Sequence, residues 1–151
     1  MPYYTQMMKR VILMMALLAA AGCGSSDSTS PSTLPPTSVG VFTTTDLTIG
    51  TGVTAVNGSR VVTNYAGWLY DTGKPFGKGS QFDPGPGPLS FTIGSANLIT
   101  GFQQGVVGMK VGGSRRVIIP PELAYGSSSP DPTKIPNNAT LVFEISLTSA
   151  Q

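Results

Sequence analysis

The sequence predicts an α+β fold in which an antiparallel sheet of about five strands has one short helix packed against it. Its 19 glycines and 13 prolines in 151 residues favour short strands joined by many turns over long helices. Residues 139–147, ATLVFEISL, alternate as a strand with one buried face does. Residues 97–109, NLITGFQQGVVGM, place Ile99, Phe102 and Val106 at spacings of three and four, which predicts a short amphipathic helix.

The strands before this helix follow from local patterns. Residues 43–49 alternate polar with apolar side chains up to a glycine turn, and residues 60–70, RVVTNYAGWLY, form a long run of β-branched and aromatic residues. Residues 71–88 contain the turn signals DTG, PFG and PGPGP, so we expect a loop there. Residues 89–93 then predict a short strand.

The second half of the domain continues the sheet. VGGSRRVIIP reads as a glycine turn followed by a strand that ends at Pro120, because proline cannot donate to a sheet ladder. A second long loop follows, with one helical turn over residues 121–124. The final strand places Leu141, Phe143, Ile145 and Leu147 on one face and Val142, Glu144 and Ser146 on the other.

Residues 1–22 have the layout of a secretory signal peptide. Lys9 and Arg10 precede the apolar run 11–21, which is too short to span a bilayer, where about 20 residues are needed. The small residues before Cys23 resemble the lipobox of bacterial lipoproteins, although Ala20 stands where leucine is commoner. We therefore expect acylation of Cys23, a membrane anchor, and a periplasm-facing lipoprotein, with Gly24 favouring the outer membrane. Cleavage among the alanines, giving a soluble exported protein, is the alternative.

The remaining chain divides into a flexible linker, residues 23–40, and a folded domain, residues 41–151. The linker is rich in Ser, Thr and Pro and has too few apolar residues to offset its ordering entropy. From Cys23 onward seven basic residues balance seven acidic ones. This balance gives no support for electrostatic binding of nucleic acid, which needs clustered Lys and Arg. The sequence contains no long coiled coil or exposed helical face that would suggest dimerisation, so we expect a monomer.

The residue types present exclude most catalytic chemistry. The chain has no histidine and its single cysteine, Cys23, lies outside the domain, which excludes Ser-His and Cys-His nucleophiles and zinc sites. No GxxxxGK[ST] phosphate loop is present. We therefore expect no cofactor and no metal, and any reaction must proceed without a nucleophile.

Several motifs in order resemble the FKBP family of peptidyl-prolyl cis/trans isomerases. They are VTNYAGWL, QFD, LITGFQQGVVGMKVGGSRRVIIPPELAYG and IPNNATLVFEISL, and they span about residues 43 to 148. The resemblance implies a five-stranded antiparallel sheet wrapped around a short helix, and rotamase activity on X-Pro bonds that assists the folding of exported proteins. It also implies proline-containing polypeptides as partners and macrolide inhibitors as further ligands.

The resemblance implies a proline pocket with a defined lining. Phe102 stands at its floor, where many members have tryptophan, and the arginine that commonly partners the aspartate has no equivalent near Asp83. The implied catalytic lining is Tyr65, Phe82, Asp83, Phe102, Tyr125 and Phe143, and the implied substrate-binding residues are Leu89, Leu98, Ile99 and Ile135.

Other interpretations of these residues remain open. Phe102 and Phe143 lie on periodic elements and could serve the core as well as the pocket, while Asp83 before Pro84-Gly85 is also a good turn former. The loop position of Phe82 predicts a ring brought to the pocket rim instead of the core. For the whole domain, a non-catalytic chaperone module that binds proline segments is the alternative to an isomerase, and a structural lipoprotein is the third possibility.

Overall fold

The computed structural model describes residues 40–95 and 97–151, which belong to the compact unit 34–151. The predicted signal peptide, Cys23 and the linker up to residue 39 lie outside the described residues. Among the residues described, no helix is long and apolar enough to cross a membrane.

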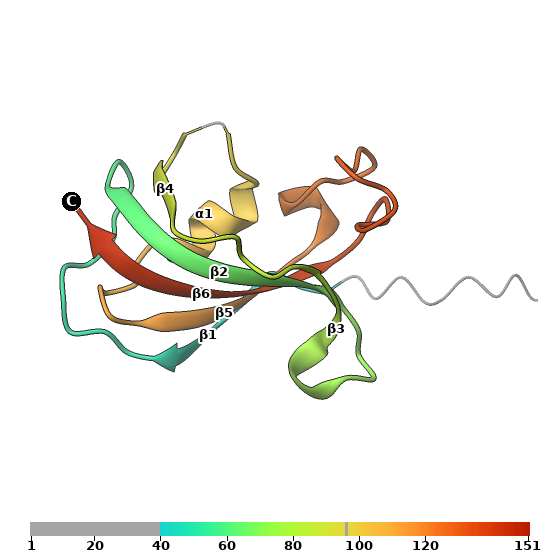
Figure 1. The fold of residues 1–151 in the computed structure, drawn as a ribbon, viewed down its shortest axis with the longest axis horizontal. Helices are drawn as coiled ribbons and strands as arrows, with labels where there is room; N and C mark the ends of the chain where they lie inside the picture. The colour runs from blue at the N-terminus through green and yellow to red at the C-terminus, as the bar shows by residue number, and fades with distance from the viewer. Residues whose placement is uncertain (1–39, 96) are drawn as a thin grey trace, which may run out of the picture. The chain divides into compact units, whose positions relative to one another are not determined.

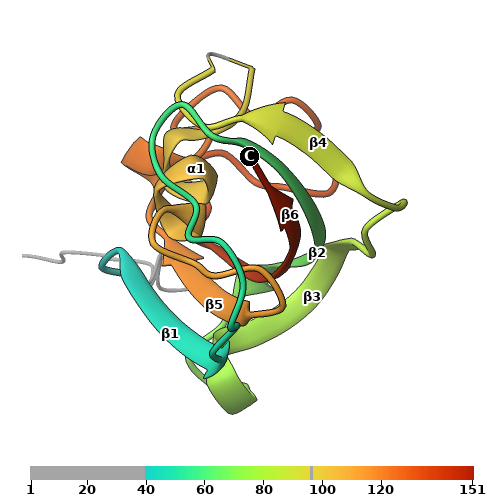
Figure 2. The same cartoon turned by 90° about the vertical axis from the view of Figure 1, so that its left-hand side faces the viewer.

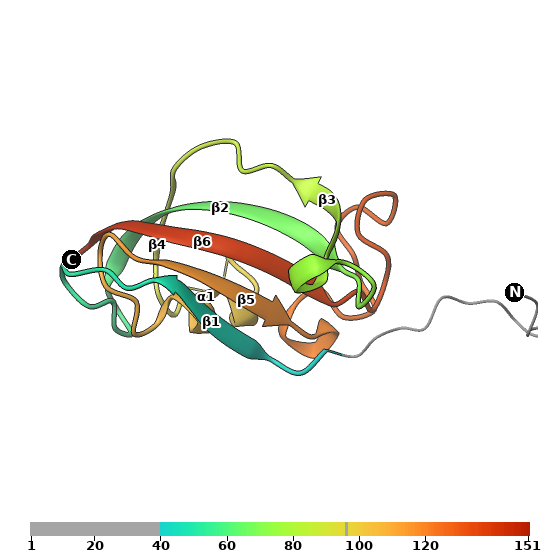
Figure 3. The same ribbon diagram turned by 90° about the horizontal axis from the view of Figure 1, so that it is seen from below.

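The domain is built on one antiparallel sheet, in the order β1-β5-β6-β2-β3, with β4 also paired to β2. Figure 1 shows the strands, and Figure 3 shows β1, β5, β6 and β2 side by side. The expected α+β sheet is therefore confirmed, with one strand more than predicted. The strands are β1 (Thr43–Thr48), β2 (Arg60–Tyr70), β3 (Lys78–Asp83), β4 (Leu89–Thr92), β5 (Ser114–Ile119) and β6 (Leu141–Ala150).

The helix α1 (Thr100–Val106) lies against β5 and β6, and the sheet curves around it (Figure 2). The core forms between α1 and the facing side of the sheet. As the alternation in β6 predicts, Leu141, Phe143, Ile145 and Leu147 all lie in this core, each at most 4% exposed. The second loop carries the 3-10 turn η2 (Pro121–Leu123), where one helical turn was expected.

Residues 71–88 are not a continuous loop, contrary to the sequence prediction. They contain the 3-10 turn η1 (Pro75–Gly77) and the strand β3. The pairing of β3 with β2 is irregular, because Gly67 opposes Asp83, Trp68 opposes Gln81 and Tyr70 opposes Lys78, with register shifts between them. Local sequence therefore specifies this strand weakly.

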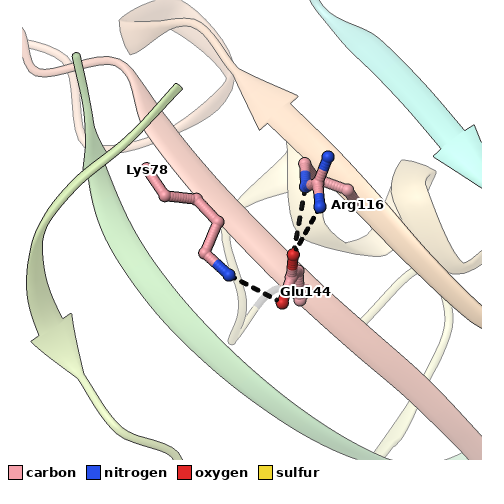
Figure 4. A network of polar contacts seen from close by, with 3 residues as sticks. All are labelled: Lys78, Arg116 and Glu144. Atoms are coloured by element: carbon pink, nitrogen blue, oxygen red, sulfur yellow. Dashed lines mark hydrogen bonds and ion pairs between the residues drawn. The ribbon is translucent and has the colours of Figure 1, made fainter. Parts of the chain in front are cut away.

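Charged side chains on the sheet face opposite α1 connect β3 to β6. Glu144 on β6 accepts a hydrogen bond from Lys78 at 3.0 Å and from Arg116 at 2.8 Å (Figure 4). Lys78 also lies 4.0 Å above the Trp68 ring, and Arg116 lies 4.3 Å above the ring of Phe76. Partial burial alone would raise the pKa of the Glu144 carboxyl, but the hydrogen bonds and charges of Arg116 and Lys78 outweigh it and hold that pKa below its ordinary value.

The strands β3 and β4 lie along the same edge of β2. β4 pairs with residues 60–63 of β2, while β3 pairs with residues 67–70. The segment between them passes the middle of β2 closely, because a Cβ on Gly85 would collide with the carbonyl oxygen of Tyr65. Gly85 also has φ +80°, which glycine adopts without strain. The chain that follows β3 therefore runs directly alongside Tyr65.

Candidate active site

A cavity of about 430 Å³ opens where the end of β3, the middle of β2 and the start of α1 meet. The alanine and tyrosine that follow η2 form its far side. Nine of the ten predicted site residues line this cavity: Tyr65, Phe82, Asp83, Leu89, Leu98, Ile99, Phe102, Tyr125 and Phe143.

Four aromatic rings form a continuous wall of the cavity. Phe102 and Phe143 meet edge to face with ring centroids 5.3 Å apart, and Tyr65 meets Phe102 in the same way at 5.5 Å. Phe82 contacts Phe143 edge to face at 5.6 Å. Such arrangements bring the positive edge of one ring to the negative face of the next. Each ring fixes the position of its neighbour.

Phe102 and Phe143 serve both the core and the cavity. They are 3% and 4% exposed and belong to the hydrophobic core, and both line the cavity. Each of these two residues therefore packs in the core and also lines the cavity, the two roles that the sequence left open. Phe82 is only partly buried, and it lies on β3 instead of a flexible loop.

Gly67 on β2 makes room for two of these rings. A Cβ at this position would lie 2.7 Å from Cζ of Phe82 and 3.0 Å from Cε1 of Phe143. Real Cβ atoms essentially never approach a heavy atom within 3.0 Å. The absence of a side chain at Gly67 is thus what allows both rings to stand where they do.

Asp83 is held by two hydrogen bonds at the cavity edge. Its Oδ2 accepts from the Tyr65 hydroxyl at 2.8 Å and its Oδ1 accepts from the backbone N–H of Gly85 at 2.9 Å. Asp83 therefore forms a turn with Gly85 and also lines the cavity. Burial, with the hydrogen bond to Asp83 and its charge as further causes, raises the pKa of Tyr65 to about 12.

Tyr125 faces Asp83 from the segment after η2. Burial first, and then the charge of Asp83, raise the pKa of the Tyr125 hydroxyl above its ordinary value. Tyr65 and Tyr125 are therefore both protonated at neutral pH. The Tyr65 proton is engaged by Asp83, whereas the Tyr125 hydroxyl makes no hydrogen bond to the described residues and is available to a ligand in the cavity.

Ile135, the tenth predicted site residue, is not among the residues that line the cavity, so the substrate-binding role that the family resemblance implies for it stays a prediction. Its backbone N–H donates to the carbonyl oxygen of Asp131 at 2.9 Å, and its side chain is 7% exposed within the hydrophobic core. Three cavity residues escaped the sequence analysis, namely Asn97, Thr100 and Ala124. Asn97 and Thr100 flank the predicted Leu98 and Ile99, and Ala124 precedes Tyr125. Their position next to predicted site residues is the one feature of the sequence that could have identified them.

The described residues hold no group of three or more His, Cys, Asp or Glu side chains that could bind a metal ion. Within this part of the chain, the cavity lining offers aromatic rings, the hydroxyls of Tyr65, Tyr125 and Thr100, the amide of Asn97 and the carboxylate of Asp83.

Comparisons with known proteins agree with this geometry. Residues 52–148 match the model of the FKBP-type peptidyl-prolyl cis-trans isomerase family. The chain is 44% identical over 113 residues to FK506-binding protein 3 of Candida albicans, covering 75% of this chain and 25% of that protein. It is 39% identical over 108 residues to FK506-binding protein 1 of Aspergillus oryzae, covering 67% of this chain and 90% of that protein.

A solved structure gives the same result. The peptidyl-prolyl cis-trans isomerase of Pseudomonas syringae pv. tomato matches with a TM-score of 0.59 and 32% identity, over 73% of this chain and 75% of that one. The chain spans only about a quarter of several of the curated relatives it matches. The match of sequence and fold over residues 52–148 shows that this chain belongs to the FKBP-type peptidyl-prolyl cis-trans isomerase family.

Proposed function

We propose that the domain accelerates cis/trans isomerisation of X-Pro bonds in polypeptides. The observation that carries this proposal is the cavity of about 430 Å³, walled by four aromatic rings and bearing the free hydroxyl of Tyr125. Membership of the isomerase family supports it. Such a site suits a reaction in which no proton moves and no covalent bond forms.

The mechanism follows from what opposes the rotation. Amide resonance sets a barrier of about 18–20 kcal/mol, and the planar amide is more charge-separated than the twisted one. Rings of Phe82, Phe102 and Phe143 hold the proline and replace the water that would stabilise the planar form. Tyr125 donates a hydrogen bond to a substrate carbonyl, and the charge of Asp83, fixed by Tyr65, orients the twisting amide.

An isomerase assay on a short Xaa-Pro peptide tests the proposal. Phe82→Ala and Tyr125→Ala should each lower kcat/KM while the folded domain persists, as judged by circular dichroism. The alternative, a chaperone module that binds proline segments without turning them over, predicts suppression of aggregation by a wild-type protein that shows no isomerisation. That result would replace the isomerase proposal.

We also propose that the cavity binds FK506-type macrolides, because the matched relatives are named FK506-binding proteins. The apolar walls at Leu89 and Phe102 support this. Titration with FK506 should inhibit the isomerase activity competitively, and Phe102→Ala should weaken the inhibition. Activity unaffected by saturating FK506 would reject this ligand.

We further propose that the protein is exported and anchored to the cell envelope through Cys23, where it assists the folding of exported proteins as a monomer. The support is the signal-peptide layout of residues 1–22 and the single cysteine that follows it. Mass spectrometry of the mature N-terminus should find an acylated Cys23, and Cys23→Ser should release the protein from membranes. An unmodified N-terminus among the alanines would leave a soluble exported protein. Light scattering of the released domain tests its monomeric state.

A further inference from the structure

The side chain of Gln103 holds the segment that leads from β4 into α1. Its Oε1 accepts from the backbone N–H of Gly94 at 2.7 Å. Its Nε2 donates to the carbonyl oxygens of Ser95 at 2.7 Å and Leu98 at 2.9 Å. The orientation of the amide is unambiguous, because a backbone N–H can only donate and a carbonyl oxygen can only accept.

This segment forms one wall of the proline cavity. Leu98 and Ile99 line the cavity, and Ile99 precedes the first residue of α1 without any side-chain cap. Among the described residues of 94–98, the backbone contributes one hydrogen bond, from Ser95 to Thr92 at 3.0 Å. The three bonds of Gln103 therefore hold most of the described segment in place.

We propose that Gln103 is a positioning residue for the cavity wall, acting through Leu98 and Ile99 on the isomerase activity proposed above. The role needs a side chain that accepts one hydrogen bond and donates two from adjacent atoms. A glutamate of the same shape keeps the acceptor for Gly94 but presents a bare oxygen to the carbonyls of Ser95 and Leu98. The amide, and not the length of the side chain, is what the segment requires.

The substitution Gln103→Glu should be sensitive to pH for the same reason. The carboxylate repels two carbonyl oxygens, whereas the protonated acid can donate to one of them. No residue lining the neighbouring hollow, which contains Gln103, has an acidic or basic side chain that would compete. Protonation should therefore restore part of the arrangement, and the variant should recover activity relative to wild type as the pH falls.

The test compares Gln103→Glu and Gln103→Ala with Gln104→Glu, which adds the same charge at the exposed neighbouring position. Isomerisation of an Xaa-Pro peptide is followed by exchange NMR, which needs no coupling protease. We expect kcat/KM to fall about tenfold in both Gln103 variants at neutral pH, and to stay near wild type in Gln104→Glu. The ratio of Gln103→Glu to wild-type activity should rise toward pH 4, while the ratio for Gln103→Ala stays flat.

Hydrogen exchange of the Gly94 amide provides a readout that does not depend on catalysis. It should be protected in wild type and exchange at least tenfold faster in Gln103→Ala. An inactive wild type with a protected Gly94 amide would overturn the proposed function while leaving the hydrogen-bonded segment intact. An active wild type matched by Gln103→Glu at every pH would overturn the positioning role, as would a Gly94 amide indifferent to Gln103→Ala.

Discussion

The substitution Gly67→Ala tests whether the positions of the aromatic rings determine activity. The new methyl group would lie 2.7 Å from Cζ of Phe82, and ordinary contact begins at 3.4 Å, so that ring must retreat by about 0.7 Å. Phe143, at 3.0 Å, must also give way. Overpacking of this kind costs about 1–3 kcal/mol of stability. A shift approaching 1 Å at a substrate-positioning group lowers kcat/KM by about tenfold or more.

The matched control is Gly73→Ala. Gly73 lies in an exposed turn, where a Cβ meets nothing nearer than the Asp71 carboxylate at 3.3 Å. Both variants are measured for kcat/KM on a short Xaa-Pro peptide and for the free energy of unfolding in urea. We expect a loss of activity and stability in Gly67→Ala and neither in Gly73→Ala. A destabilised Gly67→Ala with wild-type kcat/KM would refute the idea that the ring positions govern the reaction.

Three further perturbations probe the polar groups. Tyr125→Phe should lower kcat/KM about fivefold, since it removes a substrate hydrogen bond worth about 1 kcal/mol; unchanged kinetics would exclude that bond. Ultraviolet titration of the wild type, with the titration curve of Tyr65→Phe subtracted, should give a pKa of about 12 for Tyr65. Asp83→Asn should lower this pKa, while burial keeps it above 10. Because the folded pKa is raised, the free energy of unfolding contributed by Tyr65 is complete below pH 10 and is lost as the pH rises toward 12. Glu144→Gln should lower the free energy of unfolding by about 1 kcal/mol at neutral pH, for a partly exposed ion pair. That difference should shrink as the pH falls from the ordinary carboxyl pKa of 4.5 through the lowered pKa of folded Glu144, because the unfolded chain takes up the proton first. A difference independent of pH in urea unfolding experiments would contradict the charge network.

The strands with strong local patterns were predicted from the sequence. β6 alternates apolar and polar residues over most of its length, and β2 is a long β-branched and aromatic run, so each carries its own signal. The sequence KGSQFD of β3 carries no such signal. The side-chain contacts that β3 makes, Lys78 with Glu144 and Phe82 with Phe143, join residues that are distant in the chain and meet only in the folded sheet.

The composition of the site was more predictable than its contacts. The family resemblance supplied most of the cavity residues, since their motifs occur in order. The bond between Tyr65 and Asp83 joins residues 18 positions apart through an irregular strand pairing, which no local pattern encodes. Ile135 follows a proline-rich loop in which local pattern does not tell whether an apolar side chain packs in the core, and the structure places it there, 7% exposed.

Trp68 is the only tryptophan in the chain, and it lies beneath Lys78 on the sheet face that bears Glu144. The cavity floor is formed by Phe102 and not by a tryptophan. Selectively excited tryptophan emission therefore reports on the contact between β3 and β2, because Trp68 is not among the residues that line the cavity. A Phe102→Trp substitution would move an optical probe to the cavity floor and make binding visible by emission.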